Sequence, residues 1–250
     1  MGVVPTTIVP PRAAHAYILR ETIEDLSRAV SASRVVTVSS PAGFGKTTAM
    51  LRWAERLSAE GRPILWVAAR AGVDTLESFL GSLEQALLAA GYTIPGGRLT
   101  GDWRDWLAEF VTGRGPRPVL FVDDAQLLSP ETHQLIGQLI ASARDAMTTV
   151  IASRGECGIN LARLRSLGHL LEVRVRHLCF DTDESTQLIQ QIAGGAVPAA
   201  DVQRIVADTQ GWAAGLVLAA GAWLRDMAEG YPPDGGATGL RHEFASYFHE

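Results

Sequence analysis

The chain has 250 residues, enough for one large α/β domain with or without a small additional unit. Apolar residues make up 47% and charged residues 20%, a balance typical of a globular protein with a hydrophobic core. The formal net charge is -5, and the chain lacks the basic stripe by which nucleic-acid-binding domains contact phosphates. Two cysteines exclude a disulfide framework and a cysteine metal site, so we expect a cytoplasmic protein.

The N-terminal residues lack the basic stretch and apolar run of a signal peptide. We also expect no membrane span, because the chain holds no run of about 18 or more apolar residues.

Short apolar runs alternate with amphipathic segments over the first 175 residues. The predicted strands are VVTVS (35–39), ILWVA (64–68), VLFV (119–122), TTVIAS (148–153) and LLEVRV (170–175). Apolar residues at helical spacing predict helices near residues 50–57, 76–87, 103–110 and 135–140. Strands that are apolar along their whole length are typical of a parallel sheet covered on both faces. The pattern predicts an α/β fold with three layers.

The character of the chain changes after residue 180, where strand patterns end. Three helical stretches predict a small C-terminal helical subdomain over residues 181–230. Residues 231–239 are rich in glycine and proline, and a new amphipathic helix begins after them. We therefore expect residues 231–250 to be a linker and the start of a following domain.

The segment SSPAGFGKTT (39–48) lies between the first strand and an amphipathic helix, the context that a P-loop requires. Glycines let backbone N–H groups approach phosphates, and the helix N-terminus adds its positive dipole end. Lys46 would reach the β- and γ-phosphates, and the Thr47 hydroxyl would bind Mg²⁺. The first glycine of the usual motif is replaced by Ser40. The predicted nucleotide-binding residues here are Ala42, Gly43, Phe44, Gly45, Lys46, Thr47 and Thr48.

Two further strands end in polar residues that suit phosphate chemistry. Asp123 and Asp124 follow VLFV, and we expect Asp123 to hold Mg²⁺ and Asp124 to orient the attacking water. Arg154 follows TTVIAS, and its planar guanidinium can donate two parallel hydrogen bonds to phosphate oxygens. If its strand lies beside the P-loop strand, Arg154 points at the γ-phosphate. Asp124 and Arg154 are thus the candidate catalytic residues, and Thr47 and Asp123 the candidate metal ligands.

Five blocks, SPAGFGKTT, VLFVDDAQLL, VIASR, HLCFDTDES and TQGWAAGL, follow one another along the chain. In this order the chain resembles the N-terminal ATPase of MalT-type, large ATP-binding LuxR-family transcriptional regulators, which are signal-transduction ATPases with numerous domains. By this resemblance residues 1–180 form the nucleotide-binding domain, with an N-terminal segment over adenine. Ile18, Leu19 and Arg20 would form part of the base pocket. Two departures from the family pattern are Ala213, where proline is common, and the residues after ILWVA, which lack the usual acidic pattern.

The resemblance implies an ATP/ADP-binding switch of a signal-responsive activator, with slow Mg²⁺-dependent hydrolysis. It implies ADP in a resting monomer and ATP in a form that self-associates. DNA would be bound only by a C-terminal helix-turn-helix domain that this chain lacks.

Two other functions stay open from the sequence. A stand-alone P-loop kinase would need an acceptor pocket, and no residues after Arg154 predict one. An AAA-type motor would need an arginine finger and pore-loop aromatics, which we do not identify in the sequence.

Overall fold

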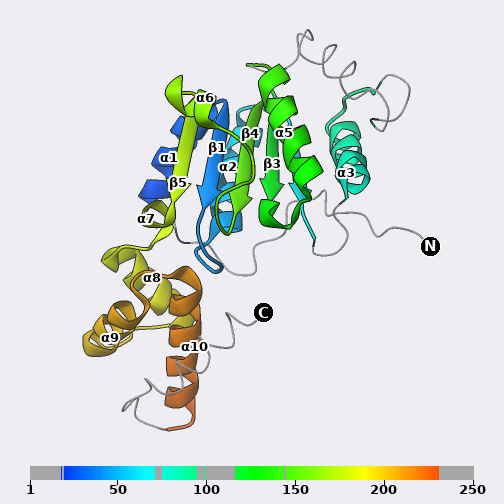
Figure 1. Ribbon diagram of the computed structural model, residues 1–250. Helices are drawn as coiled ribbons and strands as arrows, with labels where there is room; N and C mark the ends of the chain where they lie inside the picture. The colour runs from blue at the N-terminus through cyan, green and yellow to red at the C-terminus, as the bar shows by residue number, and fades with distance from the viewer. Residues whose placement is uncertain are drawn as a thin grey trace, which may run out of the picture. The chain divides into compact units, whose positions relative to one another are not determined.

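The computed structural model describes residues 18, 20–70, 75–94, 99, 116–143 and 145–230 (Figure 1). Its internal contacts divide the chain into two compact units. The first unit holds Glu21–Pro41 and the described part of Lys46–Arg174. The second holds Ile18, Arg20, the loop Ala42–Gly45 and residues 175–230. The first unit ends at Arg174, and the domain boundary at residue 180 stays a prediction.

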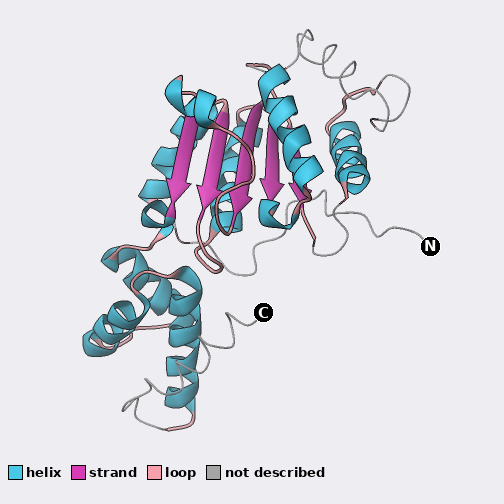
Figure 2. Cartoon of the chain, viewed as in Figure 1, coloured by secondary structure: helices cyan, strands magenta, loops and turns pink. Residues whose placement is uncertain are grey.

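The first unit is built on a five-stranded sheet in the order β2-β3-β4-β1-β5. The strands are β2 (Ile64–Ala68), β3 (Val119–Asp123), β4 (Thr148–Ser153), β1 (Val35–Ser39) and β5 (Leu170–Arg174). Every neighbouring pair is parallel, and the arrows in Figure 2 all point the same way. All residues of β3 and β4 are buried, including the polar residues of β4 and the Asp123 that ends β3, because both faces of a central strand are covered.

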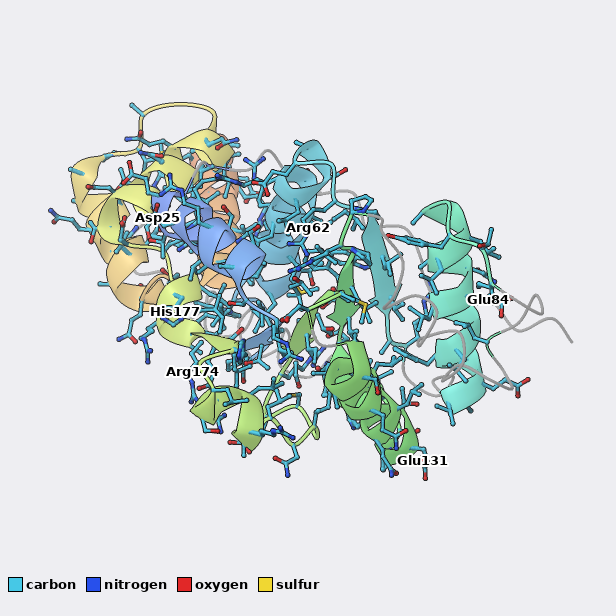
Figure 3. All side chains as sticks on the ribbon, turned by 90° about the horizontal axis from the view of Figure 1, so that it is seen from above. Asp25, Arg62, Glu84, Glu131, Arg174 and His177 are labelled. Atoms are coloured by element: carbon cyan, nitrogen blue, oxygen red, sulfur yellow. The ribbon has the colours of Figure 1, made fainter. Side chains whose placement is uncertain are left out.

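Helices cover both faces of this sheet, which confirms the expected three layers. Seen from above in Figure 3, α1 (Glu21–Ala32), which carries Asp25, lies on one side with α2 (Lys46–Ala59). On the other side lie α5 (Pro130–Ala143), which carries Glu131, and the short α6 (Ala162–Ser166). Helix α3 (Leu76–Ala89) packs beside β2 and α5. Aliphatic side chains and Phe79 from the strands and from α3 and α5 form a continuous core.

Helix α1 was not predicted from the sequence. Its buried residues are Ile23, Ser27 and Val30, so a serine replaces an apolar residue in the stripe that packs on α2. The Trp53 indole donates a hydrogen bond to the Ile23 carbonyl at 3.0 Å and ties the two helices together. Acidic residues Glu21 and Glu24 in the first turn were a usable signal for its start.

The second unit is helical, as expected, and contains α7 (Val175–Leu178), α8 (Thr182–Ala193), α9 (Ala199–Thr209) and α10 (Ala213–Ala228). Helix α8 begins with a capping box in which Asp181 and Glu184 accept each other's backbone N–H groups. Aliphatic residues from α8, α9 and α10 form a separate small core around Ile189 and Leu216. Among the described helices, none is long and apolar enough to cross a membrane.

Several predictions fall outside the described residues. These are the helix near residues 103–110, the linker at 231–239 and the helix that follows it. The predicted strand at 170–175 ends one residue earlier, because Val175 begins α7.

Gly211 occupies a position in the second unit that only glycine fits. Its φ is +76°, its carbonyl accepts the Phe180 N–H at 2.9 Å, and an added Cβ would overlap the Phe180 carbonyl oxygen. Gly194 has a similar φ of +69°, but no atom lies within 4 Å of its Cβ position. Replacing each glycine with alanine therefore distinguishes two costs. Backbone strain arises at both positions, and steric overlap arises only at Gly211.

We expect Gly194→Ala to lower the free energy of unfolding by about 1–2 kcal/mol, the cost of a left-handed alanine. Gly211→Ala should lose that amount and about 1–3 kcal/mol more, since the methyl group forces Phe180 to move. Equilibrium urea unfolding followed by far-UV circular dichroism measures both. Equal losses for the two variants would contradict the close packing of Gly211 on Phe180.

Candidate nucleotide site

The candidate site lies at the edge of the sheet where the parallel strands end. Strand β4 pairs with β1 so that Ser153 lies opposite Ser39, and it also pairs with β3. The strand that Arg154 follows therefore lies beside the P-loop strand, which meets the condition under which Arg154 would point at the γ-phosphate. This order brings the start of the P-loop, the aspartates after β3 and Arg154 to one edge, where parallel sheets bind ligands.

Thr47 and Asp123 meet directly. The Thr47 hydroxyl donates to Oδ2 of Asp123 at 2.8 Å, and Oδ1 accepts the Asp124 N–H at 3.0 Å. Asp123 is only 4% exposed, and burial raises the pKa of its carboxyl while the hydrogen bond from Thr47 opposes this shift. A buried carboxylate beside a hydroxyl offers the hard oxygen ligands that Mg²⁺ prefers.

Lys46 is the only lysine in the chain, and it is buried at the start of α2. Its ammonium donates to the carbonyls of Ser40 and Pro41, at 2.9 Å each. Burial lowers the pKa of Lys46, the charges of Asp124 and Asp123 oppose the shift, and Arg154 adds to it.

Asp124 and Arg154 are joined through a residue that sequence reasoning missed. Asp124 adopts a left-handed conformation, with φ 52° and ψ 40°, and begins the short helix η2 (Ala125–Leu127). The Gln126 amide donates to Oδ1 of Asp124 at 2.9 Å, and its oxygen accepts the Arg154 N–H at 2.9 Å. The signal available in the sequence was an amide two residues after a paired aspartate.

The P-loop residues Ala42–Gly45 make their contacts within the second unit. The Trp212 indole donates to the Ala42 carbonyl at 3.1 Å, and the Ala214 N–H donates to the Gly43 carbonyl at 2.9 Å. Gly43 has φ +76°, and an added Cβ would lie 2.6 Å from the Trp212 indole nitrogen. Glycine at this position therefore permits the approach of Trp212 as well as the turn.

Of the three residues implied to line the base pocket, Leu19 lies outside the described residues. Ile18 packs against the small core of the second unit. The Arg20 guanidinium donates to Glu184 at 3.0 Å and to the carbonyls of Leu178 and Cys179 at 2.9 and 2.6 Å. It also lies 4.0 Å over the Phe180 ring. Arg20 thus uses its side chain within the second unit, and its contact with adenine stays a prediction.

The residues present fit a phosphate group and a magnesium ion. Lys46 and Thr47 begin α2, and the N–H groups at a helix N-terminus suit phosphate oxygens. No cluster of three or more His, Cys, Asp or Glu side chains lies in the described part of the chain. A magnesium ion here would therefore take Thr47 and Asp123 from the protein and its other ligands from phosphate and water. Thr48 is exposed at the start of α2.

The chain is similar to the serine/threonine-protein kinase PknK of Mycobacterium tuberculosis and of Mycobacterium bovis, with 28% identity over 270 residues. The alignment covers 98% of this chain but 24% of each kinase, so the chain spans about a quarter of their length.

Two solved structures share the fold. The Walker-type ATPase Paby2304 of Pyrococcus abyssi has a TM-score of 0.59 and 16% identity, covering 90% of this chain and 71% of that one. The Orc1 protein of Aeropyrum pernix, solved in complex with DNA, has a TM-score of 0.60 and 15% identity, covering 90% of this chain and 64% of that one. A family model described as an AAA domain matches residues 28–159, which include the P-loop, both aspartates and Arg154. Because this match covers more than half of the 250 residues, the chain belongs to the AAA domain family of P-loop ATPases.

Proposed function

We propose that the chain is a nucleotide-dependent switch domain that binds ATP or ADP together with Mg²⁺. The observation that carries this proposal is the direct contact of Thr47 with the buried Asp123, beside the only lysine of the chain. Lys46 would exchange its two loop carbonyls for phosphate oxygens, which are stronger acceptors because they are charged.

In this proposal the residue after β3 and the residue after β4 have different roles at the γ-phosphate. Asp124 would orient the attacking water, and Arg154 would contact the γ-phosphate itself. ATP differs from ADP at this phosphate alone, so only groups that touch it can favour one conformation over another. Hydrolysis in a switch is slow, since ATP then serves as a signal.

The larger context of the switch is also a proposal. The chain spans about a quarter of the kinase PknK, which supports a regulatory ATPase region within a longer signalling protein. We propose a cytoplasmic transcriptional activator that self-associates with ATP and contacts DNA through another domain. The AAA family match favours a second candidate, an AAA-type motor subunit. Sustained rapid turnover would favour the motor, and one slow turnover per binding event the switch.

Replacement of Lys46 tests the placement of the phosphates. We expect Lys46→Ala to weaken ATP binding about tenfold or more, because each charge-assisted contact contributes about 1.5–3 kcal/mol. Isothermal titration calorimetry measures the affinity. In the unmutated protein, selective lysine labelling gives a single side-chain NMR signal, which Mg²⁺ and ATP should shift. Arg28→Ala is the control, since Arg28 is a 76% exposed cation on α1. Unchanged affinity in Lys46→Ala would refute the proposed site.

Replacement of Asp123 tests the metal site through stability. Its raised pKa means that the folded protein binds a proton more tightly than the unfolded chain, so stability falls as pH rises from about 4, where an ordinary Asp titrates. In metal-free protein we expect Asp123→Asn to raise the melting temperature at pH 7. This gain should disappear below about pH 4, where both states are protonated. With Mg²⁺ and ATP the order should reverse, since the variant loses a metal ligand. Thermal unfolding in both conditions checks this, and a variant less stable throughout would contradict it.

Asp124 and Arg154 should differ in their effects. Asp124→Asn should leave ATP affinity near normal and slow hydrolysis about 100-fold or more, as expected when a group that activates water is lost. Arg154→Ala should weaken ATP binding while ADP affinity is kept, because only ATP carries the γ-phosphate. Calorimetry with each nucleotide and single-turnover phosphate release separate the two. A proportional loss of ATP and ADP affinity in both variants would remove the division of roles.

A further inference from the structure

Gln126 connects the two candidate groups for the γ-phosphate. Its side-chain nitrogen donates to the Asp124 carboxylate, and its oxygen accepts the Arg154 backbone N–H, both at 2.9 Å. The side chain is half-buried, and both ends of the amide are used. The two bonds join the end of β3 to the end of β4.

The chemistry of the two partners fixes how this amide is oriented. An ionised carboxylate can only accept, so the NH₂ end must face Asp124. A backbone N–H can only donate, so the oxygen must face Arg154. The glutamine amide supplies a donor and an acceptor at once. Glutamate would keep the acceptor and lose the donor.

Backbone geometry holds Gln126 in this place. The left-handed conformation of Asp124 turns the chain sharply after β3, and the Leu127 N–H closes the turn on the Asp124 carbonyl at 2.9 Å. Gln126 therefore lies two residues beyond Asp124, on the side of the neighbouring strand β4. A sharp turn directly after β3 allows one side chain to reach the end of the adjacent parallel strand β4.

We propose that Gln126 is a positioning residue that couples the orientation of Asp124 to the loop that carries Arg154. When Arg154 contacts a γ-phosphate, its backbone shift is passed through Gln126 to the Asp124 carboxylate. The aspartate is then aligned for the attacking water when ATP is bound and not when ADP is bound. This inference rests on the proposed roles of Asp124 and Arg154.

Two variants separate the two halves of the link. Gln126→Glu is nearly isosteric, keeps the acceptor for the Arg154 N–H and places a negative charge against Asp124. Gln126→Ala removes both bonds. Gln134→Glu is the matched control, because it makes the same chemical change on the exposed face of α5.

Hydrogen exchange of the Arg154 amide in nucleotide-free protein is the first readout. We expect Gln126→Ala to speed exchange, and Gln126→Glu and the control to keep it slow, because both retain an acceptor for this N–H. Equal exchange in Gln126→Ala and the unmutated protein would overturn the link to Arg154.

Single-turnover hydrolysis and nucleotide affinity are the second readout. We expect Gln126→Glu to slow hydrolysis about tenfold or more, since small misplacements of a catalytic group cost up to about 100-fold. ADP affinity should stay within about twofold, because neither bond of Gln126 involves a group proposed to contact ADP. In Gln126→Ala the preference for ATP over ADP should fall as well. If Gln126→Ala does not fold, Gln126→Glu carries the test alone.

The outcomes distinguish this inference from the proposed function. If the unmutated protein binds and hydrolyses ATP while both Gln126 variants match the control, Gln126 has no positioning role and the switch proposal stands. If ATP and ADP affinities fall together in Gln126→Glu, the residue supports the fold of the site, and the inference is overturned. If the unmutated protein neither binds nor hydrolyses ATP, the proposed function fails and the role of Gln126 fails with it.

Discussion

Strand β4 lies between β1 and β3, and its backbone hydrogen bonds to both strands set the spacing of the whole site. In the proposed site the loop after β1 would bind phosphate, the residues after β3 would serve metal and water, and the residue after β4 is an arginine. If β1 lay between β3 and β4, Arg154 would lie one strand spacing, roughly 5 Å, further from the end of β3. Gln126 could then not span from Asp124 to Arg154. The order of the strands therefore determines which charges can act together.

The buried charges at this edge lower the stability of the ligand-free fold, and a bound ligand would offset that cost. Burial raises the pKa of Asp123 and lowers the pKa of Lys46, so each of these residues is charged at a cost in the absence of a ligand. The Lys46 ammonium donates to loop carbonyls, and the Asp123 carboxylate accepts from the Thr47 hydroxyl and from a backbone N–H. These partners are neutral, so a phosphate and a divalent cation would improve both environments. We therefore expect a bound ligand to stabilise the folded protein, because without it the two buried charges have only neutral hydrogen-bond partners.

The family and the function stand on different observations. Membership in the AAA domain family follows from the match over residues 28–159 and agrees with the parallel sheet. The shared fold is compatible with many activities, so function has to be argued from the site. The resemblance to regulators and the similarity to a much longer kinase both favour a switch within a signalling protein. The contacts of Gln126 add a specific mechanism by which such a switch would distinguish its nucleotides.

The sequence by itself determined the elements whose information is local. The P-loop, the paired aspartates and Arg154 each follow an apolar strand, and a motif within about ten residues is enough to recognise such a pattern. It also predicted the three layers and the helical subdomain, because burial on both faces leaves strands with unbroken apolar runs. The missed helix α1 shows the limit of this approach, since Ser27 interrupts its apolar stripe.

Tertiary structure alone decided the contacts between distant segments. Gln126 and Arg154 are 28 residues apart, Arg20 and Glu184 are 164 apart, and Ala42 and Trp212 are 170 apart. Each pair joins a side chain to a backbone group or to a capping residue far along the chain, and no local pattern shows which two segments meet. Hydrogen bonds of this kind depend on where the backbone places both groups, and that placement arises only when strands pair and helices pack.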